Sequence, residues 1–186
     1  MFRIHRVFDA STPANRQLIA QVQAMLRVRF DALGEKEIAQ LPAQLANPMK
    51  YHFRAILLVA EDGNAHVRGF AMLMHAPDLN FCYLDYLCSG RAESGRGIGG
   101  ALYERVREEA LQLGAVGVFM ECLPDDPALS PDAGTRRQNA QRLKFYETFG
   151  ARPLCNTAYE TPLKTGAADP PYLVVDLLGR DKPNSV

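Results

Sequence analysis

The sequence has no excess of charge of either sign and no long hydrophobic run. Its 21 lysines and arginines balance 21 aspartates and glutamates, so no overall field attracts nucleic acid or an anionic membrane. Apolar stretches such as residues 55–60 are far shorter than the ~20 residues that a membrane helix needs. We therefore expect a cytoplasmic protein whose partners include neither nucleic acid nor a membrane.

Cysteine is scarce, and its spacing is not that of a metal site. There is no Cys-x-x-Cys pair, and three of the four cysteines lie in apolar, strand-like stretches. A free thiol in such a stretch behaves as a small hydrophobic side chain. The histidines are scattered as well, so we expect no metal cofactor. The cysteines are Cys82, Cys88, Cys122 and Cys155.

The length and composition fit one globular domain. A chain of 186 residues with 47% hydrophobic and 23% charged residues can bury a core of its own. We expect a single domain over residues 1–180, followed by a tail at residues 181–186.

Hydrophobic periodicity predicts the order β-α-α-β-β-β-α-β-α-β-β. Leu18, Val22 and Leu26 recur at the spacing of one buried helical face, after a cap at residues 11–13. The expected strands include residues 2–8, 55–60, 67–75, 81–88, 116–122 and 172–178. The expected helices follow the cap up to residue 30 and cover residues 35–46, 98–113 and the stretch around 143–149, after a long loop at 124–134.

This order predicts an α/β fold of the α+β kind. The meander of strands before residue 89 is antiparallel, and a strand-helix-strand crossover follows it. We therefore expect a mixed, mostly antiparallel sheet of about seven strands with helices on both faces. Strict alternation along residues 81–88 puts the even-numbered residues on one face and the odd-numbered ones, with the polar Asp85, on the other.

The most informative segment is Ser-Gly-Arg-Gly-Ile-Gly-Gly-Ala at residues 94–101. Successive glycines let backbone N–H groups approach an anion, and the helix that follows adds the positive end of its dipole. The segment therefore predicts a phosphate site.

A second interpretation competes for this segment. Gly95, Gly97 and Gly100 also satisfy the dinucleotide fingerprint Gly-x-Gly-x-x-Gly, and Glu121 follows at about the distance expected of a ribose-binding acid. In that fold, however, the first glycine follows the strand directly, whereas residues 89–94 intervene here. A dinucleotide-binding oxidoreductase is therefore the more distant alternative.

The segment resembles the fingerprint of the GNAT superfamily of N-acetyltransferases. That fingerprint is Arg or Gln, two residues, Gly, one residue, then Gly or Ala, and here Ser94 stands at the position of the Arg or Gln. Asn139 and Tyr146, seven residues apart on the next helix, resemble the second signature of the family. The resemblance covers roughly residues 2–178.

The resemblance implies that acetyl-CoA binds where the fourth and fifth strands splay. Pantetheine would pair with the backbone at Leu87, Cys88 and Ser89, and the pyrophosphate would meet the glycine loop. The implied cofactor-binding residues are thus Leu87, Cys88, Ser89, Ser94, Gly95, Arg96, Gly97, Ile98, Gly99, Gly100, Asn139 and Tyr146.

The resemblance also implies direct acetyl transfer to a primary amine, with Tyr146 as the acid that protonates the thiolate. Glu121 and Asp85, on the strands flanking the expected site, are the candidate bases, and we prefer Glu121. The acidic stretch 121–126 together with Asp132 favours a cationic acceptor, such as a polyamine, a lysine side chain or another small amine.

Two further expectations concern regulation and partners. A non-catalytic GNAT-fold regulator that binds acetyl-CoA is an alternative to the enzyme. Residues 157–163 and 170–180 resemble the segment after the acetyltransferase domain in bacterial fusions with a histone-deacetylase-like module. This resemblance implies a deacetylase-like partner or domain, and the family resemblance implies a homodimer.

Overall fold

The computed structural model describes residues 1–30, 32–90, 97–154, 159 and 171–180. The chain divides into two compact units, Met1–Ala115 and Val116–Val186. The prediction of one domain over residues 1–180 stays a prediction, and the predicted tail lies outside the described residues. Within the described part of the chain, no helix is long and apolar enough to cross a membrane.

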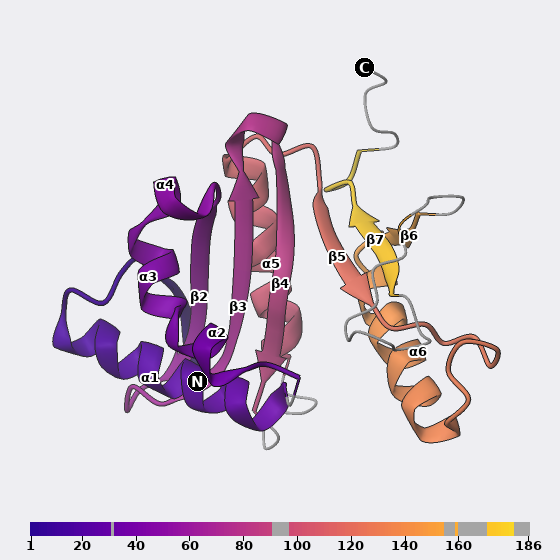
Figure 1. The fold of residues 1–186 in the computed structure, drawn as a ribbon, viewed down its shortest axis with the longest axis horizontal. Coiled ribbons are helices and arrows are strands. Elements are labelled where there is room, and N and C mark those ends of the chain that lie inside the picture. The colour runs from indigo at the N-terminus through magenta and orange to yellow at the C-terminus, as the bar shows by residue number, and fades with distance from the viewer. Residues whose placement is uncertain (31, 91–96, 155–158, 160–170, 181–186) are drawn as a thin grey trace. The chain divides into compact units, whose positions relative to one another are not determined.

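The first unit is an antiparallel meander with helices on both sides (Figure 1). Each strand pairs with the next along the chain. The strands are β1 (Phe2–Val7), β2 (Arg54–Asp62), β3 (Val67–Ala76) and β4 (Phe81–Ser89), with a 3-10 turn η1 (Pro77–Leu79) before β4. The helices are α1 (Pro13–Arg29), α2 (Glu35–Ala39), α3 (Leu41–Ala46), α4 (Pro48–Tyr51) and α5 (Ile98–Gln112).

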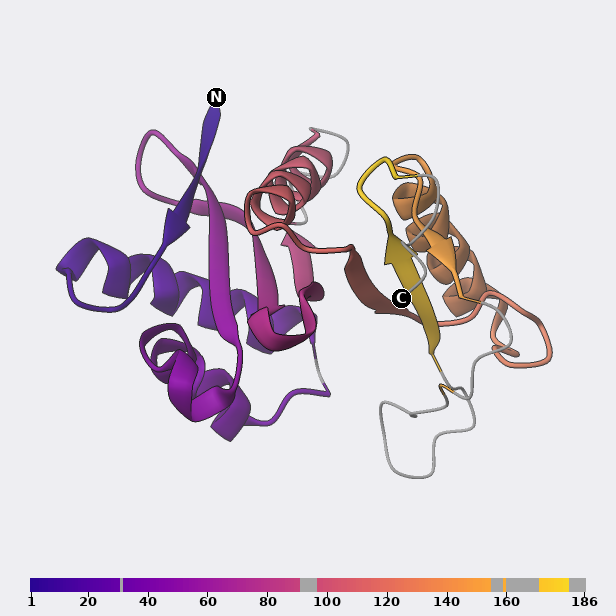
Figure 2. The same ribbon diagram turned by 90° about the horizontal axis from the view of Figure 1, so that it is seen from above.

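Two separate layers of helix cover the faces of this meander. Figure 2 shows α5 on one face and α1 to α4 on the other. On the α1 face, Val22 and Leu26 pack with Leu57 and Phe70 of the sheet in one buried cluster. The predicted cap of α1 is confirmed, because the Thr12 hydroxyl accepts a hydrogen bond from the Asn15 amide at 3.1 Å.

One expected helix is broken in two. The pattern predicted a continuous helix over residues 35–46, whereas α2 ends at Ala39 and α3 begins at Leu41. Pro42 explains the break, because proline has no N–H to donate and is tolerated only in the first turn of a helix. The short helix α4 was not predicted.

A β-bulge in β4 overturns the expected alternation. Met72 of β3 lies opposite Tyr86, and Leu73 lies opposite Leu84, so Asp85 is an extra residue in β4. An extra residue shifts the side chains that follow it to the other face of the strand.

The burial of β4 side chains agrees with this switch. Tyr86 and Cys88 belong to the buried cluster under α1. Cys82 and Leu84, which also have even numbers, are buried outside that cluster. The prediction that all four share one face was therefore wrong.

The second unit is a smaller antiparallel arrangement with one helix. The strand β7 (Tyr172–Asp176) pairs antiparallel with both β5 (Val118–Cys122) and β6 (Arg152–Pro153). Helix α6 (Ala133–Glu147) begins at a capping aspartate, Asp132, several residues earlier than its apolar pattern indicated. The predicted long loop is confirmed between β5 and α6.

The fold class is confirmed as an α/β fold whose seven strands are mostly antiparallel and flanked by helices. The dinucleotide alternative was wrong, since a dinucleotide fold needs parallel strands joined by helices. Here the glycine loop follows the last strand of an antiparallel meander.

Candidate active site

The beginning of α5 presents an open backbone. Gly97 caps the helix with a left-handed φ of 75°, and the first turn contains no acidic residue. A Cβ added at Gly97, Gly99 or Gly100 would meet no atom of the described residues within 4 Å. The first N–H groups of a helix have no partner within the helix and attract anions. Three residues of the predicted loop, Ser94, Gly95 and Arg96, lie outside the described part of the chain.

Close packing holds this helix end against the sheet. A Cβ added at Gly69 of β3 would lie 2.8 Å from the Cys88 carbonyl oxygen and 3.0 Å from side-chain atoms of Ile98 and Leu102. Only glycine permits such an approach. The predicted cofactor residue Ile98 is therefore a buried anchor, only 1% exposed, and its role in binding the cofactor stays a prediction.

A buried carboxylate anchors the other end of α5. Glu109 is 5% exposed and receives hydrogen bonds from Arg105 at 2.7 Å and from Arg6 of β1 at 3.5 Å. Burying a charge is costly unless it is paired, and here two guanidinium groups provide the pairing.

The end of β4 carries the residues expected to meet pantetheine. The Ser89 carbonyl accepts a hydrogen bond from Arg29 of α1 at 2.7 Å, and Gly90 donates to the Arg68 carbonyl at 2.8 Å. Burial raises the pKa of the Cys88 thiol, which disfavours the reactive thiolate form. Leu87 is half-buried. The pantetheine contacts at Leu87, Cys88 and Ser89 stay a prediction.

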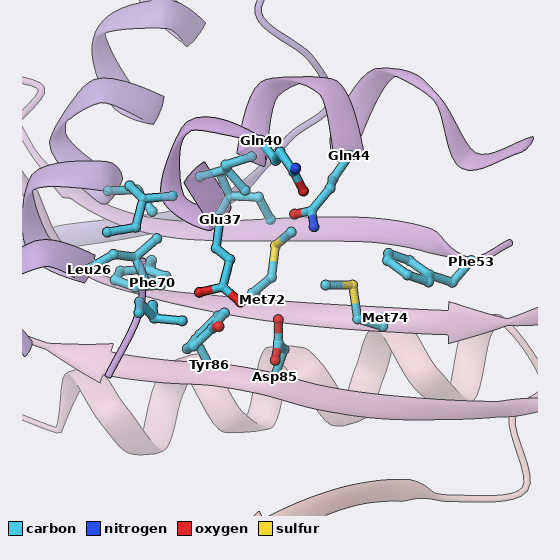
Figure 3. A pocket seen from close by; sticks show the side chains of 15 residues that line it. Leu26, Glu37, Gln40, Gln44, Phe53, Phe70, Met72, Met74, Asp85 and Tyr86 are labelled. Atoms are coloured by element: carbon cyan, nitrogen blue, oxygen red, sulfur yellow. The ribbon is translucent and has the colours of Figure 1, made fainter. Parts of the chain in front are cut away.

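The first unit contains a cavity of about 380 Å³ between the sheet and helices α1 to α3 (Figure 3). This size is within the usual range for small-molecule sites. Its walls are mostly apolar and include Val22, Leu26, Ile38, Leu57, Phe70 and Met72. Its polar lining residues are Glu37, Gln40, Gln44, Asp85 and Tyr86.

Two carboxylates and one phenol share a corner of this cavity, which we call the anionic corner (Glu37, Asp85 and Tyr86). Figure 3 shows Glu37 entering from α2, while Asp85 and Tyr86 enter from β4. The bulge explains why two consecutive residues of a strand line the same cavity. The pKa of Tyr86 is raised by burial first, then by the charges of Asp85 and Glu37.

Neighbouring contacts hold the anionic corner in place. One Glu37 oxygen accepts a hydrogen bond from the Gly34 amide at 2.8 Å, which is the Glu half of a capping box at the start of α2. The Tyr86 ring packs edge-on against Phe30, with 5.0 Å between the ring centroids. Glu37 is exposed at the mouth of the cavity, whereas Asp85 and Tyr86 are half-buried.

The second unit contains the other predicted catalytic residues. The Tyr159 hydroxyl donates a short hydrogen bond to the Glu121 carboxylate. Burial and this hydrogen bond raise the pKa of Tyr159 to about 12. Tyr146 is buried on α6, and burial raises its pKa well above the ordinary value for tyrosine. Its phenol therefore stays protonated throughout the neutral range.

Asn139 and the acidic loop have structural partners within the second unit. The Asn139 amide donates to the Pro124 carbonyl at 2.8 Å and so fastens the loop to α6. Asp126 accepts from the Ala128 amide, and Asp132 accepts from the Thr135 amide, each at 2.7 Å. These two carboxylates thus satisfy backbone donors, the ordinary role of aspartate in turns and caps.

The predicted residues are distributed over both units. The first unit holds Asp85, the β4 residues and the glycines of α5, while the second holds Glu121, Asn139 and Tyr146. The sequence interpretation missed Glu37, Tyr86 and Tyr159, because none of them belongs to a motif. Among the residues described, no cluster of histidine, cysteine, aspartate and glutamate could hold a metal ion.

Solved structures of acetyltransferases share this fold. An aminoglycoside 6'-N-acetyltransferase complexed with coenzyme A matches 97% of this chain and 99% of its own, at 16% identity and a TM-score of 0.67. The aminoglycoside 6'-N-acetyltransferase of Enterococcus faecium has the same coverage, 18% identity and a TM-score of 0.66. A GNAT-family acetyltransferase of Staphylococcus aureus matches 92% of this chain and 98% of its own, at 15% identity and a TM-score of 0.60.

No curated protein matches the chain by sequence. A family model does: residues 22–131, more than half of the chain, match the acetyltransferase (GNAT) family. This range contains the cavity-lining residues and the glycines that begin α5, and it ends before Asn139 and Tyr146. The chain therefore belongs to the acetyltransferase (GNAT) family and is an acetyltransferase whose co-substrate is acetyl-CoA.

Proposed function

We propose that the protein transfers an acetyl group directly from acetyl-CoA to a primary amine, either a small amine, a polyamine or a lysine side chain. The observation that carries the proposal is the open start of α5, where Gly97, Gly99 and Gly100 leave room for a pyrophosphate against the backbone amides. The family match over residues 22–131 supports the choice of coenzyme A as the source of that pyrophosphate.

The reaction requires a neutral amine and a protonated leaving group. The amine nitrogen attacks the thioester carbon, so that a C–N bond forms and the C–S bond breaks. The amine loses its proton to a base, and the thiolate gains a proton from an acid. The products are an acetamide and the free thiol of coenzyme A.

Tyr146 is proposed as the acid that protonates the thiolate. Burial raises its pKa, so the phenol carries a proton at every pH at which the enzyme would work, although the same shift makes it a weaker acid. Its burial also keeps water away from the hydroxyl.

Glu121 is proposed as the base, with Asp85 as the alternative. The hydrogen bond from Tyr159 orients the Glu121 carboxylate, and this orientation supports Glu121 as the base. Asp85 is supported by its place in the lining of the cavity. Glu121→Gln and Asp85→Asn distinguish the two, since loss of the base removes the acidic limb of the pH-rate profile.

The first test is calorimetric titration with acetyl-CoA and, in parallel, NAD(H), followed by thiol release with a panel of amines. Binding of acetyl-CoA with amine-dependent thiol release is the expected result. Binding without release by any amine would favour the regulator over the enzyme. A homodimer and a deacetylase-like partner remain proposals, and size-exclusion with light scattering tests the first of them.

A further inference from the structure

We propose that the acceptor is an amphipathic monoamine, a primary amine with one positive charge and an apolar body that fills the cavity of the first unit. This inference rests on the proposed function, since it names the amine that the acetyl group reaches. It also narrows that function, because a polyamine brings several positive charges into the cavity and a monoamine brings only one.

The walls of the cavity favour an apolar body. Leu26, Phe70, Met72, Met74 and Phe53 follow one another along its length in Figure 3. Burying apolar surface of a ligand is worth roughly 25 cal/mol per Å². Methionine side chains are flexible, so Met72 and Met74 can adjust to alkyl chains or to rings.

The anionic corner supplies the site for one ammonium group. Glu37 and Asp85 enter the cavity from opposite walls, and Figure 3 shows both side chains pointing into the part of the cavity that Tyr86 also lines. An ammonium placed there meets two carboxylates and the oxygen of the phenol. Asp85 is the more enclosed of the two carboxylates, whereas Glu37 stands at the mouth.

Among the described residues of the lining, no further carboxylate is placed to receive a second charge. Besides the anionic corner, the polar residues of the lining are the neutral amides Gln40 and Gln44, both on the wall formed by α2 and α3. A second ammonium within the cavity would lie against these amides or against apolar side chains. Moving an unpaired charge out of water is costly, so a diamine of equal length binds less well.

The test compares n-hexylamine, 1,6-diaminohexane and 1-hexanol, which share a six-carbon chain and carry one, two and no ammonium groups at neutral pH. Calorimetry measures binding to the whole protein, and thiol release measures acetylation of the two amines. We expect the ratio kcat/KM to be at least about tenfold higher for n-hexylamine than for 1,6-diaminohexane. Equal or better use of the diamine, or of spermidine, would overturn the proposal while leaving the acetyltransferase activity established.

Two variants of α2 test directly whether the negative charge of Glu37 contributes to amine binding. Glu37→Gln removes the charge but can still accept from the Gly34 amide, so the cap of α2 is retained. We expect about two- to fivefold weaker binding of n-hexylamine, less so at high salt, and unchanged binding of 1-hexanol. Glu35→Gln, on the same helix and outside the cavity lining, is the matched control and leaves both affinities unchanged.

A gain-of-function variant completes the test. Gln44→Glu adds a carboxylate to the α3 wall, and we expect it to reduce the preference for n-hexylamine over 1,6-diaminohexane. Unchanged affinities in both Glu37→Gln and Gln44→Glu would overturn the proposal. Binding of n-hexylamine that depends on Glu37, without any thiol release, would support the site and contradict the proposed function.

Discussion

Gly99 lies in the first turn of α5, where protein stability and ligand binding place opposite demands on a side chain. A Cβ there meets nothing within 4 Å, and Gly99 is not among the glycines with positive φ. Replacing glycine inside a helix by a better helix former stabilises it by about 0.5–1 kcal/mol. Gly99→Ala and Gly99→Leu should therefore both raise the free energy of unfolding, as urea denaturation can measure.

The same two variants should differ in their affinity for acetyl-CoA. The family fingerprint permits alanine at this position, whereas a leucine side chain would keep a pyrophosphate away from the backbone amides. We expect Gly99→Leu to weaken acetyl-CoA binding at least about tenfold and Gly99→Ala to change it little, by calorimetry. Tight binding by the leucine variant would show that the cofactor lies elsewhere.

Tyr146→Phe removes the proposed acid and keeps the ring. We expect kcat to fall by about 100-fold while the affinity for acetyl-CoA stays the same. Because burial raises the pKa of Tyr146, its ionisation cannot cause a loss of wild-type activity below about pH 10. Tyr51→Phe on α4 removes a hydroxyl elsewhere and serves as the control. Unchanged turnover in Tyr146→Phe would assign the proton to another donor.

At the scale of elements, the contact between β3 and α5 depends on Gly69. In Gly69→Ala, the new methyl group would press on the Cys88 carbonyl, Ile98 and Leu102. We expect a loss of about 1–3 kcal/mol of unfolding free energy, and weaker acetyl-CoA binding because α5 begins at Ile98. Gly63→Ala, in the turn between β2 and β3 with nothing within 4 Å, should change stability by less than about 0.5 kcal/mol.

Local signals predicted most elements and several of their ends. The cap of α1 within residues 11–13 and the end of α5, expected at residue 113 and found at Gln112, were predicted because helix ends depend on residues within one turn. The bulge at Asp85 was not predictable, since it arises from the register between two strands. Asp85 and Tyr86, at this bulge, both line the cavity. The bulge that the sequence did not reveal therefore shapes the candidate acceptor site.

At the scale of the whole molecule, buried acidic groups predict a loss of stability at alkaline pH. Burial raises the pKa of Cys82 to about 12 and that of Cys122 to about 11, and it also raises the pKa values of Cys88 and Tyr146. An ordinary thiol has a pKa of 9.0. Above about pH 9 the unfolded chain therefore releases protons that the folded protein retains.

The ionisation of these groups should consequently leave the free energy of unfolding unchanged below about pH 8. Above about pH 9 it should lower the free energy of unfolding. Each buried thiol contributes about 1.4 kcal/mol per pH unit until its folded pKa is reached. Urea denaturation between pH 7 and pH 10.5 measures the slope. Cys122→Ala removes one contributor and should reduce the slope accordingly, whereas an identical slope would show that Cys122 ionises in the folded state.

The sequence by itself determined the strand and helix order, the glycine segment that begins α5 and the family of the protein. These features follow from side-chain periodicity and backbone freedom, which neighbouring residues control. Only the tertiary structure decided what lines the cavity and what pairs with Glu121. Glu37 and Asp85 line one cavity because a helix packs over a bulged strand, and Tyr159 reaches Glu121 from a distant segment. Contacts between residues far apart in the chain leave no periodic signal in the sequence, so packing alone creates the cavity that we propose as the acceptor site.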